Sequence, residues 1–202
     1  MPKVSDAHRA ARRRQILDAA ARCFIRNGFH ATSMQDVFRE SGLSAGAVYR
    51  YFPSKHAIVR AIAEETVGEI THAIDVIVGA DPLPSIEEAM AGALAVAERR
   101  TAPDGAARIA LQVWGESQRD AALGEFVADR YREIRSCFVR LVRRAQVAGE
   151  VPAEVDPERL GAVLFGALIG YIMQQLLVGD LDPAAYRAGL HPLLDFQAPA
   201  RT

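Results

Sequence analysis

Hydrophobic residues along this chain recur at intervals of three and four, which is the spacing of one face of an α-helix. The segment 8–27 shows it at Ile16, Leu17, Ala20, Cys23 and Phe24, and the segment 55–78 shows it at Ile58, Ile62, Val67, Ile70, Ile74 and Ile77. A third segment, 120–148, repeats it at Leu123, Val127, Tyr131, Ile134, Phe138, Leu141 and Ala145. Neither strand-like alternation nor a repeat of about 20 to 50 residues is present. The pattern predicts an all-α fold.

Turn and capping residues divide the chain into nine predicted helices. Ser85 with Glu88 forms a capping box after the Asp81-Pro-Leu-Pro break, and Asp156-Pro157 and Asp182-Pro183 place a cap before a first-turn proline. Residues 101–105 are predicted to form a loop, and Gly149 to end a helix. The predicted ranges are 8–27, 32–42, 45–52, 55–78, 85–100, 106–118, 120–148, 157–178 and 183–196.

The stretch from Thr32 to Lys55 predicts two short helices joined by a tight turn, followed directly by a long helix. Thr32 with Gln35 indicates a capping box at the first start, and Gly42 a left-handed end. Ser44 caps the second helix, 45–52, which Pro53 stops and after which Ser54 caps again. This is the pattern of a helix-turn-helix.

The chemistry of that stretch suits the major groove of DNA. Ala45 and Gly46 let the backbone approach base edges, and the following aromatic and cationic side chains supply hydrogen-bond donors. Arg50 is predicted to contact a base edge, with a phosphate contact as the open alternative. Lys55, at a helix start, is expected to meet a phosphate. The predicted DNA-binding residues are Thr32, Ser33, Ser44, Ala45, Gly46, Tyr49, Arg50, Tyr51 and Lys55.

These residues resemble the amino-terminal signature of the tetracycline-repressor-like (TetR) transcriptional regulators. The resemblance covers residues 13–64 and is carried by Gly28, Phe29, Thr32, Gly42, Ser44, Tyr49, Tyr51, Phe52 and Lys55. Phe38 departs from it, because the family usually has alanine there. The resemblance implies a nine-helix fold with a DNA-binding domain at 1–54 and a ligand-binding and dimerisation domain at 55–202. It also implies a regulator, in most members a repressor, that acts as a homodimer on a palindromic operator.

The charge distribution supports contact with a polyanion at one end of the chain. The net charge is only −1, but residues 1–60 hold eleven Lys and Arg against four Asp and Glu, whereas the remainder holds thirteen against twenty-one. A basic first part and an acidic second part indicate that the first part meets DNA. Arg9, Arg12, Arg13 and Arg14 are read as a clamp on the DNA backbone, with a solvated basic turn as the alternative.

Residues 160–178 form an apolar run without a charged side chain after Arg159, long enough on paper to cross a bilayer. A membrane-anchored helical interaction protein is therefore the alternative reading. Two glutamines within the run and acidic flanks without a positive-inside bias argue against it. A helix that is apolar all round is otherwise buried on both sides, so we expect it to pair with a second copy. The predicted dimer residues are Gly166, Gly170, Leu176 and Leu190.

The resemblance also implies a small-molecule effector, and the aromatic residues of the second part favour a largely apolar one. The predicted ligand-binding residues are Gln112, Trp114, Phe138, Phe165, Tyr171 and Gln174, with ordinary core packing as the alternative for each.

Other classes of function find little support in the sequence. The five histidines lack metal-ligand spacing with each other or with the two cysteines, and no nucleophile elbow or phosphate-binding loop is present. We therefore expect no enzyme activity, no metal and no cofactor. Cys23 and Cys137 are expected to be buried thiols, and an amino terminus without an apolar run suggests a cytoplasmic protein.

Overall fold

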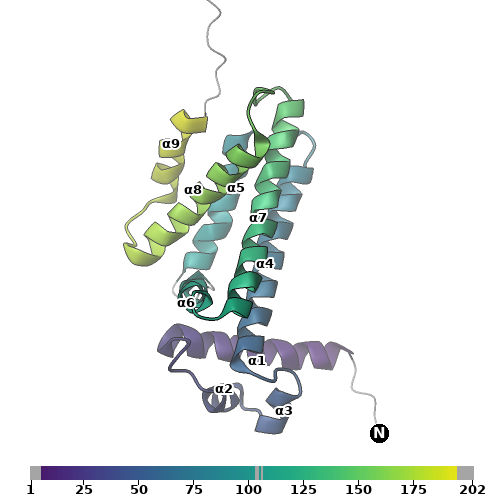
Figure 1. Ribbon diagram of the computed structural model, residues 1–202, viewed down its shortest axis with the longest axis vertical. Coiled ribbons are helices and arrows are strands. Elements are labelled where there is room, and N and C mark those ends of the chain that lie inside the picture. Colours follow the sequence, from purple (N-terminus) through teal and green to yellow (C-terminus); the bar gives the residue numbers. More distant parts are fainter. Residues whose placement is uncertain (1–5, 103–104, 106, 195–202) are drawn as a thin grey trace, which may run out of the picture. The chain divides into compact units, whose positions relative to one another are not determined.

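Residues 6–102, 105 and 107–194 are described by a computed structural model of the chain. Over these residues every regular element is a helix, which confirms the predicted fold class (Figure 1). The helices are α1 (Asp6–Asn27), α2 (Met34–Ser41), α3 (Ala45–Tyr49), α4 (Lys55–Gly79), α5 (Ile86–Thr101), α6 (Ala107–Ser117), α7 (Ala121–Val147), α8 (Pro157–Leu177) and α9 (Pro183–Leu194). The predicted helix start at 106 and end at 196 lie outside the described residues.

The chain divides into two compact units. The first contains the chain up to Thr66 together with Arg108–Val127, and the second contains Val67–Ala107 and the chain from Ala128 onward. Two helices, α4 and α7, continue from one unit into the other. The division differs from the predicted boundary after residue 54, because the first turns of α4 and the whole segment 108–127 group with the amino-terminal helices.

The first unit has its own hydrophobic core. The buried side chains come from α1, α2, α3 and the start of α4, from Phe29 and Phe52 in the connecting segments, and from three positions beyond residue 108, namely Ile109, Val113 and Leu123. The predicted face of α1 is buried as expected, since Ile16, Leu17, Ala20, Cys23 and Phe24 are at most 2% exposed. These three later residues explain the grouping of α6 with the amino-terminal helices, because they complete the same core.

The second unit is built from the rest of α4, α5, most of α7, α8 and α9. Its core contains Met90, Phe138, Leu141, Leu164 and Tyr171, each at most 1% exposed. Helix α8 contributes one buried face and packs close to α7 at Gly161, where an added Cβ would meet Val139 at 2.8 Å. By length and composition α8 could cross a membrane, yet its buried face belongs to this core.

Most predicted caps are present. Ser85 and Glu88 form the capping box of α5, and Asp156 accepts from two amides at the start of α8. Both cysteines are buried thiols, as predicted. Two local predictions were wrong. The cap of α2 is Ser33, one residue later than the predicted Thr32. Helix α3 ends at Tyr49 and not at the predicted Phe52, although the chain turns on through Phe52, whose amide still bonds Val48 O at 3.0 Å.

Candidate nucleic-acid interface

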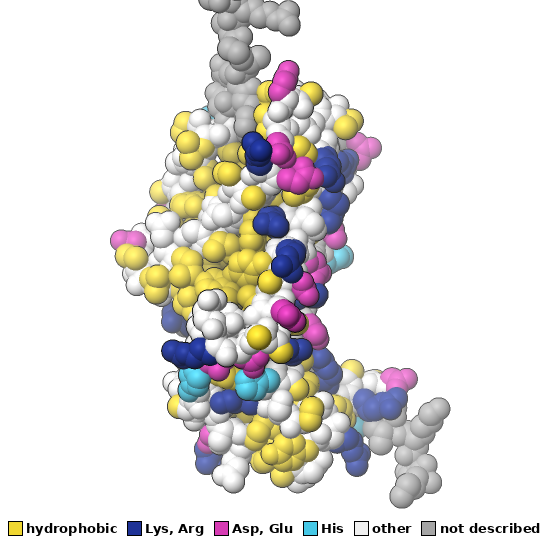
Figure 2. Space-filling view, in the orientation of Figure 1, with side chains coloured by type: hydrophobic (Ala, Val, Ile, Leu, Met, Phe, Trp, Pro, Cys, Tyr) yellow, Lys and Arg dark blue, Asp and Glu magenta, His cyan; other side chains and the backbone are white. Residues whose placement is uncertain are grey.

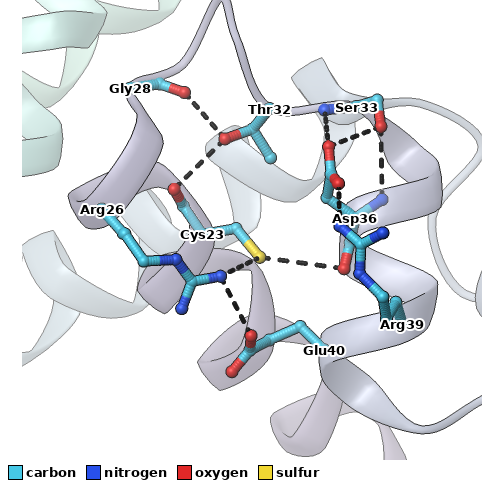
Figure 3. Close-up of polar contacts among 8 residues, drawn as sticks. All are labelled: Cys23, Arg26, Gly28, Thr32, Ser33, Asp36, Arg39 and Glu40. Atoms are coloured by element: carbon cyan, nitrogen blue, oxygen red, sulfur yellow. Dashed lines mark hydrogen bonds and ion pairs between the residues drawn. The ribbon is translucent and has the colours of Figure 1, made fainter.

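The start of α2 is fixed by Ser33 rather than Thr32 (Figure 3). The Ser33 hydroxyl accepts from the Asp36 amide at 3.2 Å, and the Asp36 carboxylate accepts from the Ser33 amide at 2.9 Å. The Ser33 hydroxyl also donates to the Asp36 carboxylate at 2.6 Å, and this bond, followed by the one from the Ser33 amide, holds the pKa of Asp36 below its usual range. The capping box is thus shifted by one residue from the predicted pair of Thr32 and Gln35.

Thr32 faces the interior of the first unit. Its side chain is 1% exposed, and its hydroxyl donates to the carbonyl oxygens of Gly28 at 2.7 Å and Cys23 at 3.2 Å (Figure 3). This geometry differs from the phosphate contact predicted for Thr32, because the hydroxyl stabilises the end of α1. The neighbouring Ser33 is exposed and remains the candidate at this position.

The turn between α2 and α3 follows the sequence prediction. Gly42 has a φ of 67°, a left-handed conformation that favours glycine, and its amide bonds the carbonyls of Phe38 and Arg39. Ser44 then caps α3 by accepting from the Ala47 amide at 3.3 Å. Val48 is buried in the core of the first unit and anchors the five-residue helix.

The opposite face of α3 is exposed to solvent. Five of the predicted residues lie on it, namely Ser44, Ala45, Gly46, Tyr49 and Arg50. Arg50 makes no ion pair with any residue that the structure describes, so its guanidinium is available to a ligand. Tyr51 is only half-buried and packs against the core. Hydrophobic side chains gather on the part of the first unit that carries α3 (Figure 2). Small residues followed by tyrosine and arginine on one exposed face form a surface suited to a DNA groove.

Lys55 points inward instead of toward solvent. Its ammonium group donates to the carbonyl oxygens of Phe29 at 2.6 Å and Thr32 at 2.9 Å, and lies 4.3 Å from the centre of the Phe29 ring. Burial lowers the pKa of Lys55. The geometry differs from the predicted phosphate contact, because the three donors of the ammonium are directed to the backbone that joins α1 to α2.

Several arginines of the first unit also serve its internal packing. Arg13 pairs with Glu65 and lies 5.6 Å from the centre of the Phe52 ring, and Arg14 reaches the same carboxylate at 3.3 Å. Arg22 bonds Glu40, as does Arg26 (Figure 3), and these bonds lower the pKa of that carboxyl. Of the four arginines predicted to clamp the DNA backbone, Arg13 and Arg14 therefore contact α4, while Arg9 pairs with Asp6 and Arg12 bonds Gln15 within α1.

Gln112 was predicted to line a ligand pocket, but the structure places it in the first unit. Its side-chain oxygen accepts from the Phe29 amide at 2.6 Å, and its nitrogen donates to Phe24 O at 3.1 Å. His30 and Glu116 add a contact of 2.8 Å between the same segments. Gln112 therefore joins α6 to the end of α1. Its partner Phe29 is 83 residues away in the sequence, and hydrophobic periodicity does not reveal a contact over that separation.

The other predicted ligand residues are dispersed. Trp114 belongs to the first unit and is half-buried, while Phe138, Phe165 and Tyr171 lie in the core of the second. Gln174 is exposed on α8. A surface hollow of about 370 Å³ in the second unit involves neither these five residues nor Gln112, and is lined by Asp81, Leu83, Arg143, Arg144, Val147 and Ala148.

The predicted dimer residues lie on α8 and α9. Gly166 is exposed, and an added Cβ would meet nothing within 4 Å, whereas Gly170 lies near the Tyr186 hydroxyl. Leu176 is half-buried, and Leu190 packs on the core of the second unit. On the same helix as Gly166, the apolar side chains of Val163 and Leu177 are 65% and 70% exposed.

This geometry defines a helix-turn-helix protein, with a capped α2, a glycine turn and a short reading helix. Residues 16–62 match the family model "Bacterial regulatory proteins, tetR family", and residues 85–197 match "BetI-type transcriptional repressor, C-terminal". The chain belongs to the tetR family of transcription regulators, which are not enzymes.

Individual relatives agree with this assignment. The chain is 32% identical over 185 residues to the HTH-type transcriptional repressor Rv1474c of Mycobacterium tuberculosis, covering 81% of this chain and 95% of that protein. Among solved structures, Salmonella enterica GusR is 26% identical with a TM-score of 0.73 and covers 95% of this chain and 98% of its own. Bacillus subtilis FadR, solved with stearoyl-CoA, shares the fold at 17% identity and a TM-score of 0.77, covering 92% and 99%.

Proposed function

We propose that this protein is a repressor that binds a palindromic DNA operator as a homodimer and responds to a small, largely apolar effector. The observation that carries the proposal is the exposed face of α3, formed by Ser44, Ala45, Gly46, Tyr49 and Arg50. The small residues admit the helix to the major groove, and Arg50 offers two donors to a guanine edge. Ser33 and Tyr49 contact phosphates on either side. The family and the repressor Rv1474c support the direction of regulation.

The proposed homodimer is supported by the short length of the DNA-reading helix α3 and by the exposed surface of α8. A reading helix of five residues covers few base pairs, so useful specificity needs two half-sites spaced by about 34 Å along the duplex. Helix α8 presents Val163, Gly166 and Leu177 to solvent, and α9 presents Leu193 at 73% exposure. Hydrophobic side chains accordingly gather over the α8 side of the view (Figure 2). A second copy of this chain covers that surface, and the glycine permits close approach of the two helices.

The effector binds in the second unit. Its core is aromatic and apolar, with Tyr131, Phe138, Phe165 and Tyr171 in or against it, and the related FadR was solved with an acyl-CoA ester. A ligand that prefers one arrangement of α4 and α7 changes the affinity for the operator, because both helices continue into the DNA-binding unit. Coupling typical of such switches alters operator affinity by about 5 to 150-fold. As a DNA-binding regulator, the protein is expected in the cytoplasm.

Selection of bound fragments from random DNA tests this function directly. The purified full-length chain is mixed with a random duplex library, and the retained fragments are sequenced after several rounds. We expect a palindrome whose half-sites lie about one helical turn apart. Recovery of single, non-repeated sites contradicts the homodimer on DNA, and recovery of unrelated sequences contradicts the function.

A further inference from the structure

Phe38 lies beside the proposed DNA-reading helix α3. The residue is on α2, half-buried against the core of the first unit. Its ring meets the ring of Tyr49 edge to face, with 5.3 Å between centroids and 70° between planes. Tyr49 is the last residue of α3 and is 49% exposed. The contact therefore joins a residue that is anchored inside to one that faces solvent.

The backbone around Phe38 also organises the turn. Its carbonyl oxygen accepts from the Leu43 amide at 3.3 Å and from the Ser41 hydroxyl at 3.1 Å. The residue thus binds the turn through its carbonyl and the end of α3 through its ring. Because α3 has only five residues and a single buried one, Val48, few other contacts fix its outward side chains.

We propose that Phe38 is a positioning residue that holds the Tyr49 hydroxyl in place for a DNA phosphate. The inference rests on the proposed DNA-binding function. A tyrosine on a helix surface ordinarily samples several rotamers, and freezing one of them on binding costs conformational entropy. Edge-to-face contact with Phe38 selects one ring orientation before DNA arrives, since such geometry is favoured by the ring quadrupoles. An alanine at position 38 has no ring to do this.

A double-mutant cycle tests the idea through operator affinity. Tyr49→Phe keeps the ring contact but lacks the hydroxyl, whereas Phe38→Ala removes the ring partner. We expect each single variant to bind the selected operator about three- to tenfold more weakly, the value of one neutral hydrogen bond. The double variant is expected to be no weaker than the poorer single variant, because both changes act on one contact. Multiplication of the two losses in the double variant overturns the proposal, as does full affinity of Phe38→Ala.

Two controls separate positioning from stability. Ile25→Ala also shortens a half-buried side chain on the same core, but on α1, and is expected to lower the melting temperature without weakening operator binding. The salt dependence of binding should stay unchanged in Tyr49→Phe and Phe38→Ala, because neither removes a cation. A reduced salt slope in Phe38→Ala means that the whole reading helix has moved, which also contradicts the specific role. If Phe38→Ala does not fold, Phe38→Leu takes its place in the cycle. Absence of operator binding by the unaltered chain sinks the proposed function itself.

Discussion

The backbone amide of Phe29 donates to the side-chain oxygen of Gln112 at 2.6 Å, and the nitrogen of the same side chain donates back to Phe24 O. One glutamine of α6 therefore satisfies two backbone groups at the end of α1. Through this link the segment 108–127 becomes part of the DNA-binding unit.

Loss of that link is expected to destabilise the first unit. Gln112→Ala leaves the part-buried Phe29 amide without its partner, which costs about 1–3 kcal/mol. It also removes one donor from Phe24 O, which keeps its bond from the Gly28 amide. Chemical denaturation followed by circular dichroism measures the change. Gln118→Ala, at an exposed position just past the end of α6, serves as the control and should be neutral. Equal stability of the two variants contradicts the role given to Gln112.

Substitution of Lys55 distinguishes a role in internal packing from a contact with DNA. Lys55→Met keeps most of the aliphatic stem but leaves the Phe29 and Thr32 carbonyl oxygens without the ammonium, so we expect a loss of about 1–3 kcal/mol in unfolding free energy. The slope of log affinity for DNA against log salt should stay the same as in the unaltered chain. A stable variant whose slope falls by about one assigns Lys55 to a phosphate instead.

The ion pairs of Glu40 predict a pH dependence of stability. Hydrogen bonds from Arg22, then Arg26, hold its pKa below the ordinary 4.5. A carboxyl whose pKa is lowered on folding stabilises the protein above its unfolded pKa, and this contribution is lost as the pH falls through the lowered value. The unaltered chain should therefore exceed Glu40→Gln in melting temperature at pH 7. The gap should close as the pH is lowered beneath about 4.

The control for this titration is Glu64→Gln, an exposed carboxyl on α4. It should show a small difference from the unaltered chain at every pH. A gap between the unaltered chain and Glu40→Gln that stays constant from pH 7 to pH 3 contradicts the account of these ion pairs.

Dimerisation is tested best at Gly166, because an added side chain there meets nothing within 4 Å in one copy. Gly166→Glu should therefore fold normally and dissociate the dimer, since the charge would be buried against the partner. Light scattering at micromolar concentration measures the mass. Gly68→Glu is the matched control, because Gly68 is also exposed on a helix and open to an added Cβ. A dimer that persists in Gly166→Glu means that the interface lies elsewhere on the chain. Purification that succeeds only with detergent would favour a membrane role for α8.

Arg50 should determine base preference. Arg50→Ala is expected to reduce discrimination at one base pair by about 1–3 kcal/mol, as loss of a bidentate guanine contact does. Affinities for single-base variants of the selected operator measure it. Arg187→Ala, exposed on α9, should leave them unchanged. Uniform weakening over all sequences, with a salt slope lower by about one, would show that Arg50 contacts a phosphate.

Local structure could be predicted from the sequence because its causes are local. Gly42 and Ser44 act within three or four residues of themselves, so their spacing was enough to place the turn and the start of α3. The cap of α2 was misplaced by one residue because Thr32 and Ser33 both suit it, and only burial of Thr32 decides between them. Lys55 and Gln112 were assigned other roles because their partners, carbonyls and amides near Phe29, become neighbours only after folding. The sequence alone does not show whether a lysine side chain points into the protein or toward solvent.

Whether α3 reads a DNA sequence can be measured by titrating the unaltered chain with the selected palindrome and with a scrambled duplex of equal length. At physiological salt we expect the palindrome to bind at least about a thousandfold more tightly, the lower bound for specific recognition. Equal affinity for the two duplexes would mean that the exposed face of α3 reads no sequence, and the account would fail.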